Sequence, residues 1–133
     1  MSSSENFVIA LDGGSGTGKS TTAKIVAKTL GITYLDTGAM YRAVTLAALD
    51  KGLPAEEGPA MDELLSNLTL GFDSENHILI NGVCRESEIR GMKVSSNVSI
   101  YCALPSVRAA MTKQQREIGK KQSCILDVIE FLK

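Results

Sequence analysis

A run of glycines followed by a lysine and a serine has the clearest chemical content in the chain: Gly13-Gly14-Ser15-Gly16-Thr17-Gly18-Lys19-Ser20. Its spacing satisfies the pattern G-x-x-x-x-G-K-[ST], whose glycines let the backbone curl until several N–H groups point at one anion. Lys19 adds a mobile charge near the terminal phosphates, and the Ser20 hydroxyl is a ligand for Mg²⁺. The segment, extended to Thr21, therefore predicts a binding site for a nucleoside triphosphate.

The flanking elements are those that such a loop requires. The apolar residues 7–11 are typical of a strand, and residues 21–30 are typical of a helix whose positive end near Lys19 favours phosphate. Residues 32–36 follow as a second strand, which predicts a β-α-β unit with a parallel, right-handed crossover. The apolar face of the helix is expected to carry Ala23, Val26 and Leu30.

The rest of the chain continues as an α/β protein with one local departure. An antiparallel hairpin is expected from residues 68–72 and 78–83, which interrupts the α/β rhythm and indicates an insertion. A third strand is expected from residue 123. The helices expected in this part are 38–51, a short piece at 61–65, and a stretch from about Lys93 to Lys121 interrupted at Pro105.

A second group of polar residues follows the second strand. Asp36 and Thr37 come at the carboxyl end of that strand, where open α/β sheets bind ligands. Arg42 lies a little over one turn into the next helix, and Arg108 lies in the first turn of the helix that Pro105 begins. A cation near the positive end of a helix opposes its dipole, so both arginines gain most by facing an anion. The spacing leaves open whether the two arginines converge on one phosphate or lie on the surface. It also leaves open that Asp36 and Thr37 only end the strand and cap the helix.

Composition places few further limits on function. The chain has 133 residues, 44% hydrophobic and 22% charged, which suits one globular domain. Its net charge of −1 gives no basic footprint, so neither nucleic acid nor a membrane surface is an expected partner. With no long apolar stretch and no basic leader pattern, we expect a cytoplasmic protein.

The spacing of the cysteines and the histidine in the sequence does not indicate a metal site. Cys84, Cys102 and Cys124 are odd in number and too far apart for a C-x₂-C pattern, so buried free thiols are expected. His77 falls in the predicted hairpin turn without an evident ligand pattern, and we expect it to be exposed and without function.

Taken in order, several segments resemble the bacterial cytidylate kinases: residues 12–20, the block Leu35-Asp36-Thr37-Gly38-Ala39-Met40-Tyr41-Arg42, Glu88-Ile89-Arg90, Val98-Ser99, Pro105-x-Val107-Arg108 and Gln115-Arg116. The combination of segments is far more specific than any one of them, since adenylate, guanylate and shikimate kinases share the phosphate loop but not the block around Asp36. The resemblance implies the fold of the P-loop nucleoside-monophosphate kinases, a parallel sheet with helices on both faces and a small antiparallel insertion. Residues 53–95 match the monophosphate-binding insertion of that fold.

The resemblance also implies an activity, the transfer of the γ-phosphoryl group of ATP to CMP or dCMP in the presence of Mg²⁺. Lys19, Arg42 and Arg108 are then the expected catalytic residues, and Ser20 is the expected metal ligand. The expected partners are these nucleotides alone, and the resemblance suggests a monomer at full length. The acceptor is expected to contact Asp36, Thr37, Arg42, Ser99 and Arg108.

The resemblance extends over residues 6 to about 127. Beyond Asp127 the chain reads Val128-Ile129-Glu130 where the family has Gly-Arg-Asp, so we expect residues 1–133 to be a truncated, incomplete kinase domain with marginal stability and at most trace activity. Two other functions stay open: a noncatalytic nucleotide-binding fragment of such a kinase, and a kinase for another small acceptor.

Overall fold

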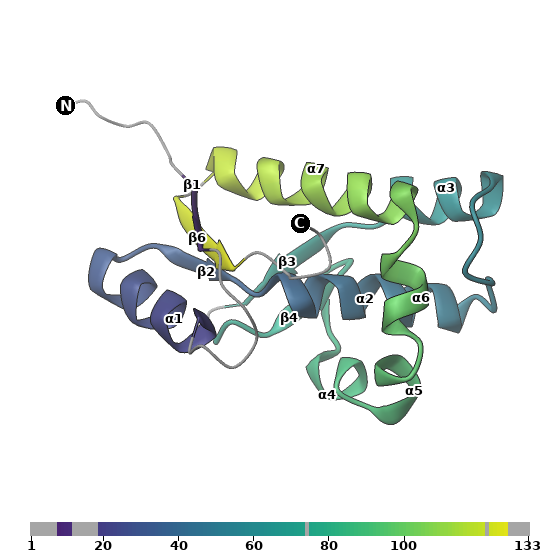
Figure 1. Ribbon diagram of the computed structural model, residues 1–133, viewed down its shortest axis with the longest axis horizontal. Coiled ribbons are helices and arrows are strands. Elements are labelled where there is room, and N and C mark those ends of the chain that lie inside the picture. Colours follow the sequence, from purple (N-terminus) through teal and green to yellow (C-terminus); the bar gives the residue numbers. More distant parts are fainter. Residues whose placement is uncertain (1–7, 12–18, 74, 122, 128–133) are drawn as a thin grey trace. The chain divides into compact units, whose positions relative to one another are not determined.

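The computed structural model describes residues 8–11, 19–73, 75–121 and 123–127, so the loop at residues 12–18 lies outside it (Figure 1). The described residues group into two compact units, one drawn from 1–37 and 115–133 and the other from 38–114. Helices α2 (Thr37–Asp50) and α7 (Pro105–Lys121) each contribute residues to both units.

The first unit is built on a parallel sheet with the strand order β1–β6–β2 (Figure 1). Leu11 pairs with Asp127 and Leu35 pairs with Leu126, so the carboxyl ends of the three strands lie at one edge. The predicted parallel β-α-β unit is confirmed, and the strand expected from residue 123 lies between its two strands. The strands are β1 (Val8–Leu11), β2 (Thr33–Leu35) and β6 (Cys124–Asp127).

Helix α1 (Lys19–Leu30) connects β1 to β2 and packs small side chains against the sheet. Gly31, at a φ of 68°, ends it, and the Ile32 N–H donates to the Ala27 carbonyl at 2.9 Å. The expected place of Leu30 on the buried face is wrong, since 54% of it is exposed. It belongs to the last turn, where the chain is already leaving the helix for β2. The buried cluster beneath the helix consists of Ala23, Ala27, Tyr34 and Ile125.

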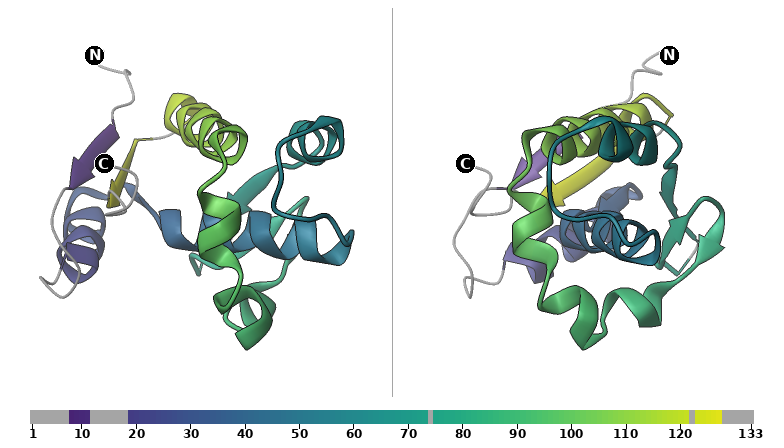
Figure 2. Two further views of the ribbon diagram at one scale, coloured as in Figure 1. Left: turned by 45° about the vertical axis from the view of Figure 1, so that its right-hand side comes forward. Right: turned by 90° about the vertical axis from the view of Figure 1, so that its right-hand side faces the viewer.

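Helix α2 forms the centre of the second unit. The right-hand view of Figure 2 looks along it, with the later elements of the unit arranged around it. A helix that is buried on nearly every side needs apolar residues all round, which its sequence supplies. Gly52, at a φ of 66°, ends the helix, and the Leu53 N–H donates to the Ala48 carbonyl at 2.9 Å. The buried side chains of α2 in this unit are Ala39, Met40, Tyr41, Ala43, Val44, Thr45, Leu46, Ala47 and Ala48.

Short elements follow α2 in the second unit, and they include the predicted hairpin. They are α3 (Pro59–Ser66), β3 (Leu70–Phe72), β4 (Ile78–Ile80), β5 (Val83–Cys84), α4 (Glu86–Ile89), α5 (Met92–Ser95) and α6 (Val98–Cys102). The antiparallel pairing of β3 with β4 confirms the hairpin. The expected second strand is too long, because Asn81 and Gly82 both take positive φ and turn the chain into β5. An Asn-Gly pair is the preferred sequence for such a two-residue turn.

The helix expected from Lys93 is broken into α5, α6 and α7. Two side chains between α5 and α6 form hydrogen bonds with the backbone of the preceding turn. Ser96 Oγ donates to the Met92 carbonyl at 2.6 Å, and Asn97 Nδ2 donates to the Lys93 carbonyl at 2.8 Å. Such local bonds compete with helix continuation. Helix α7 begins at Pro105 as predicted. Glu57 caps it from outside, because its carboxylate accepts bonds from the Ser106 amide and hydroxyl.

Candidate active site

The first unit supplies the frame that a phosphate-binding loop requires. Strand β1 ends at Leu11 and α1 begins at Lys19, so residues 12–18 connect a parallel strand to a helix start, as predicted. The first turn of α1 contains no acidic residue, so none of its own side chains offsets the positive end of the helix dipole. The loop residues and the side chains of Lys19 and Ser20 lie outside what the structure describes.

Asp36 and Thr37 follow β2 at the same edge of the parallel sheet. Because Leu35 is in register with Leu126, and Leu11 with Asp127, this edge also contains the point where β1 leads into the loop. Thr37 is 2% exposed and Asp36 is half-buried. The structure thus places both residues at the carboxyl edge of the parallel sheet, which is what their position after the strand predicted.

Arg42 belongs to the second unit and is held by neutral partners. Its Nη1 donates to the Ile89 carbonyl at 3.2 Å and to Ser95 Oγ at 2.8 Å. These bonds connect α2 to α4 and α5. They fix one terminal nitrogen of the guanidinium without reducing its charge.

Arg108 lies on α7 and is anchored in the same way. Its Nε donates to the Cys102 carbonyl at 3.2 Å, and its side chain is otherwise largely exposed. Within the described part of residues 38–114, neither Arg42 nor Arg108 forms an ion pair with a carboxylate. Both guanidiniums therefore keep their positive charge available within this unit.

The buried thiol of Cys102 lies within the electrostatic reach of both arginines. Burial raises the pKa of Cys102 to about 12, although Arg108 and then Arg42 act to lower it. Burial, followed by the nearby Cys102, also raises the pKa of Tyr41 to about 12, again against the influence of Arg108. At neutral pH both groups are uncharged, so neither neutralises the guanidiniums. An oxyanion is the ligand that two such cations would bind most strongly.

The predicted residues thus divide between the two units. Asp36 and Thr37 belong to the first, whereas Arg42, Ser99 and Arg108 belong to the second, where Ser99 is exposed on α6. Ser95 and the Ile89 carbonyl, which orient Arg42, were not predicted. Ile89 occurs in one of the family-like segments, but no spacing rule connects either residue to an arginine about fifty positions earlier.

The family model described as Cytidylate kinase matches residues 9–128. The chain belongs to the cytidylate kinase family. It is 48% identical over 122 residues to a cytidylate kinase of Clostridioides difficile, an alignment that covers 92% of this chain and 56% of that relative. It is 42% identical over 126 residues to the cytidylate kinase of Shouchella clausii, with coverages of 92% and 56%.

A longer relative contains the same family sequence. The bifunctional pantoate ligase/cytidylate kinase of Trichodesmium erythraeum is 45% identical over 122 residues, which cover 90% of this chain and 23% of that protein. The chain therefore spans about half the length of its cytidylate kinase relatives and about a quarter of the bifunctional one. Membership confirms the expected P-loop nucleoside-monophosphate kinase fold. Among the described residues, no helix is both long and apolar enough to span a membrane.

Proposed function

We propose that the protein transfers the γ-phosphoryl group of ATP to CMP or dCMP, giving ADP and CDP or dCDP, with Mg²⁺ as the metal ion. The observation that carries this proposal is the pair Arg42 and Arg108, two guanidiniums near one buried, uncharged thiol and without a carboxylate partner in their unit. Cytidylate kinase is the name of the family and of the relatives at 42–48% identity.

On the acceptor side, Arg42 and Arg108 would bind the phosphate of the monophosphate. Each guanidinium has one nitrogen anchored to neutral protein atoms, which leaves its planar fork oriented for a two-point contact with phosphate oxygens. Ser99, exposed on α6, would add a contact from the same unit. On the family resemblance alone, Asp36 and Thr37 would also contact the acceptor. We retain residues 53–95 as the proposed monophosphate-binding insertion.

On the donor side, the residues present fit ATP and Mg²⁺. The loop pattern follows β1 and precedes α1, whose first turn has no acidic side chain to repel phosphate. Lys19 and the loop amides of residues 13–18 would bind the β- and γ-phosphates, with Thr21 beside them. Ser20 would hold Mg²⁺, which neutralises phosphate charge when bound.

Positioning and charge neutralisation account for the chemistry. The attacking group is a phosphate oxygen that is already ionised, so the reaction needs no strong general base. The protein must bring two anions together and stabilise charge on the transferring group. Arg42 and Arg108 would do so from the acceptor side and Lys19 from the donor side.

A coupled assay of ADP release by purified residues 1–133 tests the proposal, with CMP, dCMP, UMP, AMP and shikimate as acceptors. We expect turnover with CMP or dCMP above that with the other acceptors. A higher rate with shikimate, AMP or UMP would favour a kinase for another acceptor. Binding of ATP and CMP without turnover would favour a noncatalytic nucleotide-binding protein.

Calorimetric titration with CMP separates a binding failure from a catalytic one. Arg108→Lys should weaken CMP binding, because lysine keeps the charge but loses the planar fork. Lys113→Arg, the reverse substitution at an exposed residue of the same helix, is the control and should bind CMP like the unmodified chain. Equal effects of the two substitutions would overturn the acceptor assignment.

A further inference from the structure

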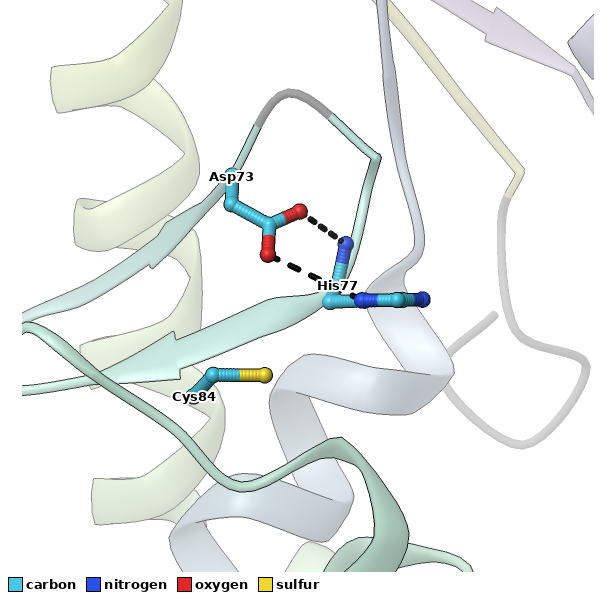
Figure 3. A group of neighbouring side chains, drawn as sticks. All are labelled: Asp73, His77 and Cys84. Atoms are coloured by element: carbon cyan, nitrogen blue, oxygen red, sulfur yellow. Dashed lines mark hydrogen bonds and ion pairs between the residues drawn. The ribbon is translucent and has the colours of Figure 1, made fainter.

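The turn of the β3–β4 hairpin and the end of β5 bring three different metal-ligating side chains together. Figure 3 shows Asp73, His77 and Cys84 around one space. Asp73 follows β3, His77 precedes β4, and Cys84 ends β5. Their carboxylate, imidazole and thiol ligand atoms all lie within 4.8 Å of one another.

The register of the sheet explains why these residues share a face. Cys84 pairs with Leu79, and His77 lies two positions before Leu79, so the side chains of His77 and Cys84 point to the same side. The Asp73 N–H donates to the His77 carbonyl at 3.0 Å, which extends the hairpin pairing by one step. The opposite face carries the buried Ile78 and Ile80. The three ligands are therefore held on the outer face by backbone pairing.

The turn itself is shaped by the carboxylate. Asp73 Oδ1 accepts bonds from the N–H groups of Glu75 and His77, each at 2.9 Å, which leaves Oδ2 facing the imidazole. His77 Nδ1 lies 3.7 Å from Asp73 Oδ2 and 3.8 Å from Glu75 Oε2. These separations exceed those of hydrogen bonds, so neither carboxylate is bonded to the ring nitrogen. The expectation that Cys84 is buried is wrong. His77, which we expected to be exposed and without a ligand pattern, is partly buried and lies beside an aspartate and a cysteine.

We propose that Asp73, His77 and Cys84 form a binding site for a thiophilic divalent cation of the Zn²⁺ class. A mixed set of oxygen, nitrogen and sulfur ligands suits Zn²⁺, whereas Mg²⁺ and Ca²⁺ take oxygen ligands. Tetrahedral Zn²⁺ places its ligand atoms about 3.5 Å apart. The cluster reaches that spacing by side-chain rotation, because Cys84 is exposed and His77 is only partly buried. On binding, the Cys84 thiol gives its proton to solvent, and Glu75 or water fills the fourth position.

The site would tie the β3–β4 turn to β5. Since β5 is only two residues long and exposed, a bound cation would hold it more firmly than its own pairing does. The consequence is local to the second unit and does not depend on the proposed kinase activity.

Titration of residues 1–133 with Co²⁺, under a non-thiol reductant, tests the site by absorption. We expect visible d–d bands of tetrahedral Co²⁺ and a near-ultraviolet thiolate-to-cobalt band, both removed by Zn²⁺. Cys84→Ser should abolish the thiolate band. His77→Gln and Asp73→Asn should weaken Co²⁺ binding by about 10-fold or more, the range found even for partners outside the first ligands.

The controls keep the result interpretable. In Asp73→Asn the side-chain oxygen can still accept the two turn hydrogen bonds. Circular dichroism of each variant tests whether it folds. Asp62→Asn, an exposed carboxylate on α3, should bind Co²⁺ like the unmodified chain. Absence of the bands at millimolar Co²⁺, or a thiolate band that persists in Cys84→Ser, would overturn the proposal.

Discussion

Ser95 Oγ lies 2.8 Å from Nη1 of Arg42 and accepts its hydrogen bond, which connects α5 to α2 inside the second unit. Nη1 also donates to the Ile89 carbonyl, so one nitrogen of the guanidinium is fixed by two neutral acceptors. A fixed guanidinium loses less conformational freedom when it binds phosphate. In the proposed reaction, Ser95 would therefore position Arg42 on the acceptor side.

Ser95→Ala should weaken CMP binding while leaving ATP binding unchanged. The lost bond involves a charged donor at an exposed serine, so we expect a cost of about 1 kcal/mol, or about fivefold in the CMP dissociation constant. Calorimetric titration measures the dissociation constants of CMP and of ATP. Ser96→Ala is the matched control, since among the described residues the Ser96 hydroxyl donates to the backbone carbonyls of Met92 and Lys93 and not to Arg42. A similar loss in both variants would argue against positioning by Ser95.

Arg42→Lys should impair CMP use more than ATP use. Lysine retains the charge but cannot form the two-point contact or reach both neutral acceptors in the same geometry. We expect a loss of about 1–3 kcal/mol in kcat/KM for CMP, read from steady-state assays in which each substrate is varied in turn. If KM rises for ATP and not for CMP, Arg42 belongs to the donor side.

Lys19→Ala should weaken ATP binding and abolish transfer, because it removes the charge that follows the β- and γ-phosphates. Circular dichroism should stay close to that of the unmodified chain. Lys28→Ala, an exposed lysine near the other end of α1, should bind ATP normally. Unchanged ATP affinity in the Lys19 variant, measured by calorimetry, would remove the basis for the phosphate-loop assignment.

Tyr41 should make the folded state sensitive to alkali. Its pKa is raised from 10.0 to about 12, first by burial, so the folded chain holds this proton more tightly than the unfolded chain. The resulting stability is complete below pH 10 and is lost as the pH rises through 12. In urea unfolding, the decline over this range should be shallower in Tyr41→Phe, by at most about 3 kcal/mol. Parallel declines in the two proteins would contradict a buried, protonated Tyr41.

Local signals in the sequence were sufficient for the elements that frame the site. Each of these signals determines structure within a few residues of its own position. The apolar run before the glycines forms a strand, Gly31 and Gly52 end helices with positive φ, and Pro105 begins one. The family-like segments located Arg42 and Arg108 on their helices.

The contacts that join distant segments had no such local signal. Ser95 reaches Arg42 across 53 positions, and Glu57 caps α7 across 49 positions. The grouping of Asp73, His77 and Cys84 depends on the strand register and on the turn at Asn81 and Gly82. We expected one uninterrupted strand over residues 78–83, and such a strand contains neither the turn nor the pairing that follows it. The spacing of residues along the chain predicts which of them share a face of one helix or strand. It does not predict these groupings, because they arise from the packing of separate elements against one another.

The position of β6 between β1 and β2 has a consequence for synthesis on the ribosome. Among the described strands, β1 and β2 each pair with β6 and not with one another, so residues 8–11 wait for residues 124–127 to emerge. The residues that pair and pack within the second unit, 38–114, are all synthesised before β6. Pairing of β1 with β6 also closes a long loop, which is entropically costly and slow. The frame of the phosphate loop should therefore be the later part to acquire order. Pulse-labelled amide exchange during refolding should show protection of Ile78 before Ile125, and simultaneous protection would show that both units form in one step.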